Sequence, residues 1–155
     1  HRHQVCSTVT PWLFIAGEKI SVDLGTLREK SITCVVNCAD GTCASPFVDA
    51  GILYHALPLR DSPDEELVPF LYGVVETVEA VRRAGGRTLV HCHQGVSRSG
   101  SFVIAYLMWA YGLGWQATLD VARDVRGTIS PNPGFLCQLM EWEVELAAMR
   151  SRQLS

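Results

Sequence analysis

The sequence predicts an α/β fold in which a mainly parallel sheet of about five strands is flanked by helices. Short apolar runs bounded by turn residues alternate with longer segments of helical periodicity, and several of the short runs are nearly continuous in apolar or β-branched residues. Hydrophobic residues make up 48% of the chain and charged residues 19%, a composition typical of globular proteins. Because two domains would each have a marginal core at this length, we expect residues 1–155 to form one domain.

Five strands are expected, at residues 5–8, 13–16, 32–36, 52–57 and 88–91. The last three are the richest in apolar and β-branched residues. Strands of this kind are covered on both faces, so these three are predicted to form the centre of the sheet.

Four helices are expected. Apolar residues repeat at helical spacing from Phe70 to Val81, and Gly85 then ends a crossover helix. Residues 102–111 are apolar on all sides, which predicts a buried helix that begins near Ser99 and stops at Gly112. Two amphipathic helices follow, and Asn132 and Pro133 provide the cap and first turn of the second one. Their apolar stripes are Trp115, Leu119, Ala122 and Val125, then Phe135, Leu139, Trp142, Leu146 and Met149.

Charge and hydropathy exclude several kinds of partner. The net charge of −3 includes no long run of either sign, so we expect neither a nucleic-acid groove nor binding to an anionic membrane. The longest apolar stretch, residues 102–111, has about half the length that a membrane-spanning helix needs. Residues 1–4 are polar and lead into no apolar run of the kind found in signal peptides, so none is expected.

Six cysteines could form three disulfides, but a chain with this much apolar material does not need them. We expect reduced thiols and a location in the cytoplasm, or also in the nucleus. A zinc site built from Cys34, Cys38, Cys43 and a histidine would lack the paired, closely spaced ligands of common structural sites. No metal and no other cofactor is therefore expected.

The segment that carries chemistry follows the predicted strand 88–91. A polar loop leads from this strand into the predicted helix, and such a strand, loop and helix N-terminus bring backbone N–H groups together as an anion site. Cys92 stands at the mouth of the loop, where donors and positive charge favour the thiolate. Arg98 returns across the loop, and its planar guanidinium can hold two phosphoryl oxygens. The expected phosphate-binding residues are His93, Gln94, Gly95, Val96, Ser97 and Arg98.

Of the six cysteines, only Cys92 has an arginine at the sixth position after it. A bare C-x5-R spacing is weak evidence, since it arises by chance. The glycine at position 95, the hydroxyls of Ser97 and Ser99, and the flanking strand and helix make coincidence unconvincing. A buried inert cysteine beside a surface arginine is the alternative.

Residues 91–99, with the pattern His-Cys-x5-Arg-Ser, resemble the signature loop of protein tyrosine phosphatases, and in particular their dual-specificity branch. The likeness covers roughly residues 5–148, including 13–17, 32–37, 104–108 and 131–135. It implies the fold of that family, a phosphocysteine intermediate, no metal and a mobile aspartate as proton donor. It also implies that Ser99 helps the thiolate to leave and that His91 orients the loop through hydrogen bonds, although a plain strand-end histidine stays open. Asn132 is expected to support the site.

The family places its acidic residue about thirty positions before the nucleophile, and Asp61 lies 31 residues before Cys92. A carboxyl group that protonates the leaving oxygen fits this chemistry. Asp64 is a competing candidate. Glu65 and Glu66 are more simply the solvated start of a helix.

The resemblance to the small, atypical members of the branch predicts a phosphatase acting on phosphotyrosine and on phosphoserine or phosphothreonine in proteins. Residues 100 and 101 are Gly-Ser where the branch more often has an Ala-Thr-like pair, so the first turn of the helix is expected to pack differently. The loop contains no lysine, which argues against a phosphoinositide substrate. The oligomeric state stays open.

Three alternative functions remain. The first is a phosphatase of RNA 5′-phosphates, lipids or glycans, and the second is a weakly active module that binds phosphoproteins. A sulfurtransferase or an arsenate reductase also uses C-x5-R, but neither explains Asp61. As a separate hypothesis, Cys38 or Cys43 could form a reversible disulfide with Cys92 after oxidation. The simpler interpretation is a small buried side chain.

Overall fold

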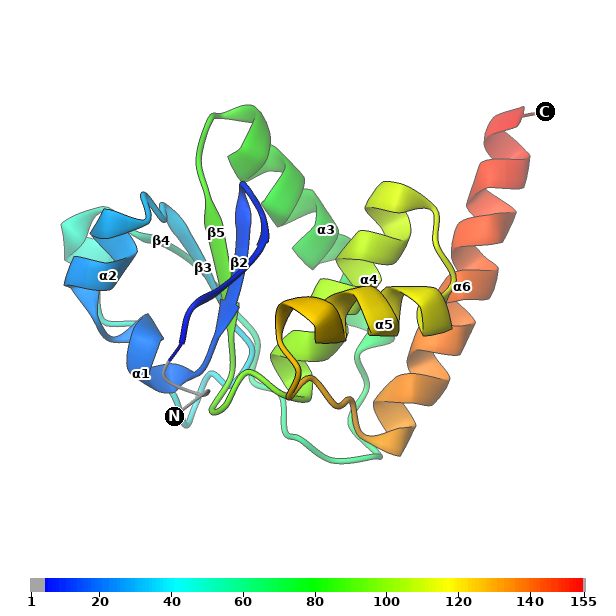
Figure 1. Cartoon of the computed structure of the whole chain (residues 1–155), viewed down its shortest axis with the longest axis horizontal. Coiled ribbons are helices and arrows are strands. Elements are labelled where there is room, and N and C mark those ends of the chain that lie inside the picture. The colour runs from blue at the N-terminus through cyan, green and yellow to red at the C-terminus, as the bar shows by residue number, and fades with distance from the viewer. Residues whose placement is uncertain (1–4, 155) are drawn as a thin grey trace.

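The computed structural model describes residues 5–154 and contains one sheet of five strands. Along the sheet the strands follow the order β1 (Ser7–Thr10), β2 (Leu13–Ala16), β5 (Thr88–His91), β3 (Cys34–Asn37) and β4 (Leu53–Ala56). Strand β1 pairs antiparallel with β2, and the other three pairings are parallel. With helices on both sides of the sheet (Figure 1), the predicted fold class is confirmed.

The predicted order within the sheet is partly wrong. Strand β4 is an edge strand and Leu53 is 64% exposed, whereas the fully buried β2 joins β5 and β3 at the centre. Of the apolar residues at 52–57 that suggested a central strand, Ile52 and Leu57 are buried but flank β4, whereas Leu53 and Ala56 within the strand are exposed. An edge strand has a neighbouring strand on one side and solvent on the other. It therefore needs few apolar residues among those that pair with the neighbouring strand.

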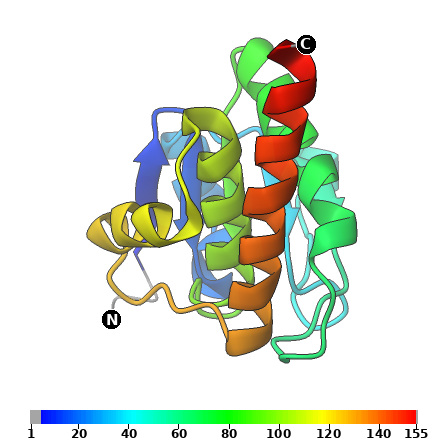
Figure 2. The ribbon, with the colours of Figure 1, turned by 90° about the vertical axis from the view of Figure 1, so that its right-hand side faces the viewer.

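The helices form two layers of unequal size. Helices α1 (Glu18–Ser21) and α2 (Leu24–Glu29) lie on one side of the sheet, together with a short 3₁₀ helix, η2 (Val48–Ala50). The larger layer contains α3 (Val68–Arg83), α4 (Arg98–Tyr111), α5 (Trp115–Val125) and α6 (Pro133–Leu154), and Figure 2 shows α4 behind α6 and next to the strands. Strand residues alternate between the two cores, because neighbouring side chains on a strand point to opposite faces.

The four long helices are confirmed close to their predicted positions. Helix α4 ends at Gly112, whose φ of +70° suits a residue without a Cβ. Trp142 of α6 is fully buried and donates from Nε1 to the Ala105 oxygen of α4 at 3.0 Å. The Asn132 side chain caps α6 by accepting from Phe135 N at 2.9 Å. Within residues 5–154, none of the helices combines the length and apolar character needed to span a bilayer.

Candidate active site

The phosphate-binding loop predicted from the sequence connects β5 to α4 at the carboxyl end of the parallel strands. Its carbonyl groups are held outward by distant partners. The His93 oxygen accepts from Glu18 N at 2.9 Å, and the Val96 oxygen accepts from Ser130 N at 3.0 Å. Because the carbonyls are occupied outside the loop, the N–H groups of Gly95, Val96 and Ser99 face the Cys92 sulfur. The loop and the first turn of α4 thus form the expected ring of donors.

Cys92 lies at the bottom of this ring and is 3% exposed. Burial alone would raise the pKa of its thiol, but the Ser99 hydroxyl and the three backbone N–H groups stabilise the thiolate and leave the pKa below its ordinary value. The Ser99 Oγ atom is 3.1 Å from the Cys92 sulfur. Ser99 is therefore in contact with the atom whose departure it is expected to assist.

Arg98, the first residue of α4, is 9% exposed and lines the same small hollow as Cys92. One of its nitrogens, Nη1, donates to the Leu59 oxygen at 2.8 Å. This contact fixes the arginine against the segment that carries Asp61. The guanidinium then has further donors free to point at an anion above Cys92.

Sequence reasoning missed Arg126, which follows α5 and is only 4% exposed. Its guanidinium donates to the Gly95 oxygen at 3.0 Å and to the Gln94 oxygen at 2.9 Å. It also donates to the Val5 oxygen and to Ser7 Oγ. Arg126 therefore ties the back of the phosphate-binding loop to the N-terminal strand. Arg126 continues the buried stripe of Thr118 and Ala122 at a spacing of four residues. A charged residue at a core-facing helical position is the sequence feature that could have identified it as important.

Gly95 has a φ of +72°, as expected for the one loop position where a Cβ is excluded. A Cβ there would lie 2.7 Å from the Ala16 oxygen and 3.0 Å from Arg126 Nε. Glycine at this position is needed both for the left-handed backbone and for the close approach of the arginine.

His91 is fully buried at the end of β5, and its Nδ1 lies 3.2 Å from the Cys92 oxygen. Its Nε2 has no hydrogen-bond partner among the residues that the structure describes. Burial lowers the pKa of His91 to about 4, so the ring is neutral near pH 7. A neutral, buried ring suits the expected positioning role better than that of a base.

Asp61 is brought to the rim of the hollow, as the sequence predicted. The hollow has a volume of about 120 Å³ and is lined by Asp61, Cys92, His93, Gln94, Val96, Ser97 and Arg98. Asn132 Nδ2 donates to the Asp61 carboxylate at 3.0 Å, while the backbone N–H of Asn132 donates to Ser97 Oγ at 3.0 Å. Asn132 thus connects the acidic loop to the phosphate-binding loop, which gives the predicted supporting residue a specific task.

The competing acids lie elsewhere. Asp64 accepts a hydrogen bond from Ser62, which lowers the pKa of the Asp64 carboxyl, and Asp64 does not line the hollow. Glu65 pairs with Arg60 at 3.5 Å, and Glu66 lines a separate hollow at the start of α3. Among the four acids, the geometry favours Asp61.

Gly134, in the first turn of α6, keeps the acidic loop in place. A Cβ at this position would overlap the carbonyl group of Pro63, two residues after Asp61. We expect Gly134→Ala to push the loop away from Cys92 and to lower kcat by about tenfold or more, since a displacement of about 1 Å is costly at a reacting centre.

The matched control is Gly73→Ala in the interior of α3, where the nearest atom to a new Cβ is His55 Cε1 at 3.6 Å. This change should raise the free energy of unfolding by about 0.5–1 kcal/mol and leave kcat unchanged. Steady-state kinetics and thermal unfolding of both variants test the assignment. Equal kcat values for Gly134→Ala and the wild type would show that the loop position does not matter.

The two cysteines considered for a redox role have different surroundings. Burial raises the pKa of Cys38 well above its ordinary value, and the nearby negative charge of Cys92 raises it further. Cys43 instead lies 3.6 Å from His93 Nδ1. A disulfide of either cysteine with Cys92 stays a prediction.

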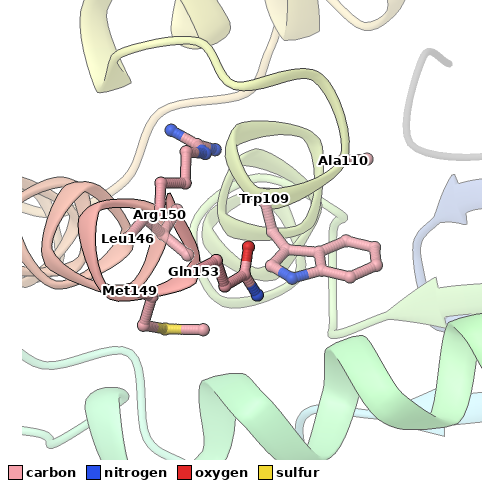
Figure 3. Close-up of a pocket in the computed structure, with 6 residues that line it drawn as sticks. All are labelled: Trp109, Ala110, Leu146, Met149, Arg150 and Gln153. Carbon is pink, nitrogen blue, oxygen red and sulfur yellow. The ribbon is translucent and has the colours of Figure 1, made fainter. Parts of the chain in front are cut away.

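A second hollow, of about 260 Å³, lies between the ends of α4 and α6, where Trp109 and Gln153 are close to each other (Figure 3). Trp109 is eleven residues along α4 from Arg98, or about 16 Å at the helical rise. The lining residues Trp109, Ala110, Leu146, Met149, Arg150 and Gln153 offer no nucleophile. This hollow is separate from the site at Cys92.

Comparison with known proteins gives the same answer as the geometry. The family model described as the dual specificity phosphatase catalytic domain matches residues 13–145. The protein-tyrosine-phosphatase MKP1 of Arabidopsis thaliana is 38% identical over 92% of this chain and 18% of its own length. Human dual specificity protein phosphatase 2 is 32% identical over 89% of this chain and 43% of its own length. The chain thus spans less than half of either relative.

Among solved structures, human DUSP28 superposes with a TM-score of 0.82 and 30% sequence identity, covering 92% of this chain and 95% of that one. Fold, loop geometry and family model therefore agree. They confirm the family expected from the sequence. The chain belongs to the dual specificity phosphatase family.

Proposed function

We propose that this chain removes phosphate from phosphorylated protein side chains in two displacement steps. In the first step the Cys92 thiolate attacks phosphorus, a sulfur–phosphorus bond forms and the bond to the substrate oxygen breaks. Asp61 gives its proton to that leaving oxygen. Arg98 and the loop N–H groups hold the remaining phosphoryl oxygens and stabilise the charge of the transition state.

In the second step water attacks the phosphocysteine. Asp61, now a carboxylate, takes a proton from the water, and the sulfur–phosphorus bond breaks to give inorganic phosphate and the thiolate. The Ser99 hydroxyl, 3.1 Å from the sulfur, donates to the thiolate as it leaves. Water is the one co-reactant that the two steps require.

One observation carries this proposal: the Ser99 hydroxyl, 3.1 Å away, and three backbone N–H groups converge on the 3% exposed sulfur of Cys92 and lower the pKa of its thiol despite burial. A buried thiol in ordinary surroundings has a raised pKa, as Cys34 and Cys38 do. Only donors aimed at the sulfur reverse the effect of burial. The same donors are placed to bind the oxygens of a phosphoryl group.

The substrates include phosphoserine and phosphothreonine besides phosphotyrosine. None of the seven residues that line the hollow of about 120 Å³ is Phe, Tyr or Trp, so the hollow has no large aromatic wall on which a phenyl ring could stack. A site that recognises the phosphoryl group through loop N–H groups and Arg98 accepts either kind of ester. Pocket walls that stack a ring would favour phosphotyrosine alone.

Release of phosphate from peptides carrying each of the three phosphorylated residues tests the proposal. We expect turnover of all three. An RNA with a 5′-phosphate, a phosphorylated glycan and phosphoinositide vesicles serve as comparison substrates. Faster turnover of any of these, or peptide binding with no turnover, would contradict a protein phosphatase.

Replacing Asp61 with asparagine should lower kcat by about a hundredfold with phosphoserine peptides, because proton donation typically contributes two to four orders of magnitude. The loss should be smaller with nitrophenyl phosphate, whose leaving oxygen needs no proton. Steady-state kinetics with both substrates provide the measurement.

Asp64→Asn is the matched control and should keep its activity within about twofold, because Asp64 lies outside the hollow. A hundredfold loss in Asp64→Asn, with Asp61→Asn active, would assign the acid to Asp64 instead.

A further inference from the structure

Three metal-binding side chains meet beside the phosphate-binding loop, although they are far apart in the sequence. Glu18 begins α1, Cys43 lies in the segment after β3, and His93 follows Cys92 directly. One ligand atom from each lies within 4.8 Å of the others. Their role is not explained by the phosphatase mechanism, in which the backbone of residue 93 rather than its ring holds the loop.

Two of the three separations are close to those between the ligands of a tetrahedral ion. Cys43 Sγ lies 3.6 Å from His93 Nδ1, and His93 Nδ1 lies 3.8 Å from Glu18 Oε1. Zinc bonds of about 2.3 Å to sulfur and about 2.0–2.1 Å to nitrogen and oxygen, at tetrahedral angles, place sulfur and nitrogen about 3.5 Å apart and nitrogen and oxygen about 3.3 Å apart. Cys43 Sγ also lies 3.9 Å from His93 Nε2, over the face of the ring, so the half-exposed His93 ring must rotate to aim Nδ1 at the ion, and Glu18 must move with it.

A hydrogen bond on the far side of the ring sets the tautomer of His93 that a metal ligand needs. Its Nε2 lies 2.9 Å from Thr42 Oγ1, and the Thr42 hydroxyl donates to the Ala39 oxygen at 3.1 Å. Since that hydroxyl proton is already used, Thr42 accepts from His93 Nε2–H. The lone pair of a neutral ring is then on Nδ1, the nitrogen that lies 3.6 Å from Cys43 Sγ and 3.8 Å from Glu18 Oε1. An outer hydrogen bond of this kind fixes the tautomer in known metal sites.

We propose that Glu18, Cys43 and His93 bind a zinc ion, with the fourth position open to solvent. Thiolate, imidazole and carboxylate together suit zinc, and the thiolate disfavours magnesium and calcium, which prefer oxygen ligands. The charges of the Cys43 thiolate and the Glu18 carboxylate balance those of Zn²⁺. Two of the three side chains are half-exposed, so the ion can enter from solvent.

An ion at this position would affect the phosphate-binding loop. Glu18 N already donates to the His93 oxygen at 2.9 Å, so the backbone of α1 contacts the loop directly. Zinc would add a second connection through the side chains and would join the segment after β3 to both. The site therefore couples the level of available zinc to the mobility of the residue next to Cys92.

Cobalt, which replaces zinc and absorbs light, tests the site directly. The Cys92→Ser variant is used as background, because it removes the other thiolate nearby and makes the result independent of phosphatase activity. We expect one equivalent of Co²⁺ to bind with a thiolate-to-cobalt charge-transfer band and the visible spectrum of a tetrahedral ion, and Zn²⁺ to displace it. The additional change Cys43→Ser should abolish the charge-transfer band, and the control Cys137→Ser should keep it.

Two further variants act on exposed side chains and keep the test valid if Cys43→Ser fails to fold. His93→Gln should weaken Zn²⁺ binding by at least tenfold, and so should Thr42→Val, which touches no metal. Competition with a chromogenic zinc chelator measures both affinities, and circular dichroism checks the fold. Absence of the band, its persistence in Cys43→Ser, or unchanged affinity in both His93→Gln and Thr42→Val would overturn the proposal.

Discussion

Replacing Cys92 with serine should abolish phosphate hydrolysis, a loss of about five orders of magnitude or more, while phosphopeptides still bind. Serine keeps the shape of the side chain and the loop hydrogen bonds, so the donors that hold the phosphoryl group stay in place. The serine hydroxyl, however, cannot be ionised by the donors that ionise a thiol. Removal of an activated nucleophile costs about this much in other hydrolases.

Three measurements check this expectation. Steady-state hydrolysis of an aryl phosphate gives the loss of activity, and isothermal titration with a phosphotyrosine peptide gives the retained binding. Rapid acid quench of the wild type with ³²P-labelled peptide should trap label on Cys92. The control Cys137→Ser changes an exposed cysteine on α6 and should be fully active. Measurable turnover by Cys92→Ser, or label on another residue, would contradict the covalent mechanism.

The parts of this molecule that the sequence predicted are those with local causes. Helix α4 follows from an apolar run with a polar loop before it and Gly112 after it, and α6 follows from the Asn132 cap and the apolar stripe behind it. Cys92 and Arg98 belong to the same category. They are six residues apart, and the strand and helix on either side determine the loop between them.

The predictions failed where the cause lies far away in the sequence. Strand β4 was expected at the centre of the sheet, because residues 52–57 are mostly apolar. The composition of this segment does not show whether another strand pairs with the outer side of β4. Helices α1 and α2 have only four and six residues, too few for a helical period to stand out. Their presence covers the second face of the sheet.

The loop shows the same limit at the level of single contacts. Its carbonyl groups are held by Arg126, which is 31 residues from Gly95, and by Glu18, which precedes His93 by 75 residues. A charged residue at a core-facing position marks Arg126 as unusual, but the sequence does not show which groups its side chain binds. The approach of Cys43 and Glu18 to His93 depends entirely on the order of strands β2, β5 and β3. The spacing of these three residues along the chain does not predict that their side chains meet.

The arginine of the loop has two tasks, and lysine can perform neither fully. Arg98 presents a planar fork to the phosphoryl oxygens and at the same time donates from Nη1 to the Leu59 oxygen at 2.8 Å. A lysine in this 9% exposed site has one nitrogen, which can be placed against the phosphoryl oxygens or against the Leu59 oxygen but not against both. We expect Arg98→Lys to lower kcat/KM by about a thousandfold, in line with the loss of a guanidinium that stabilises transferring phosphoryl charge.

The contact with Leu59 makes a second expectation possible. Leu59 is two residues before Asp61, so loss of the arginine also loosens the segment that carries the acid. The effects of Arg98→Lys and Asp61→Asn should therefore be less than additive in a double-mutant cycle on kcat/KM, with a coupling of about 1 kcal/mol. The exposed Arg123→Lys is the matched control and should retain activity within twofold. Full additivity would mean that Arg98 acts on the phosphoryl group alone, and a loss below tenfold in Arg98→Lys would mean that a single positive charge is sufficient.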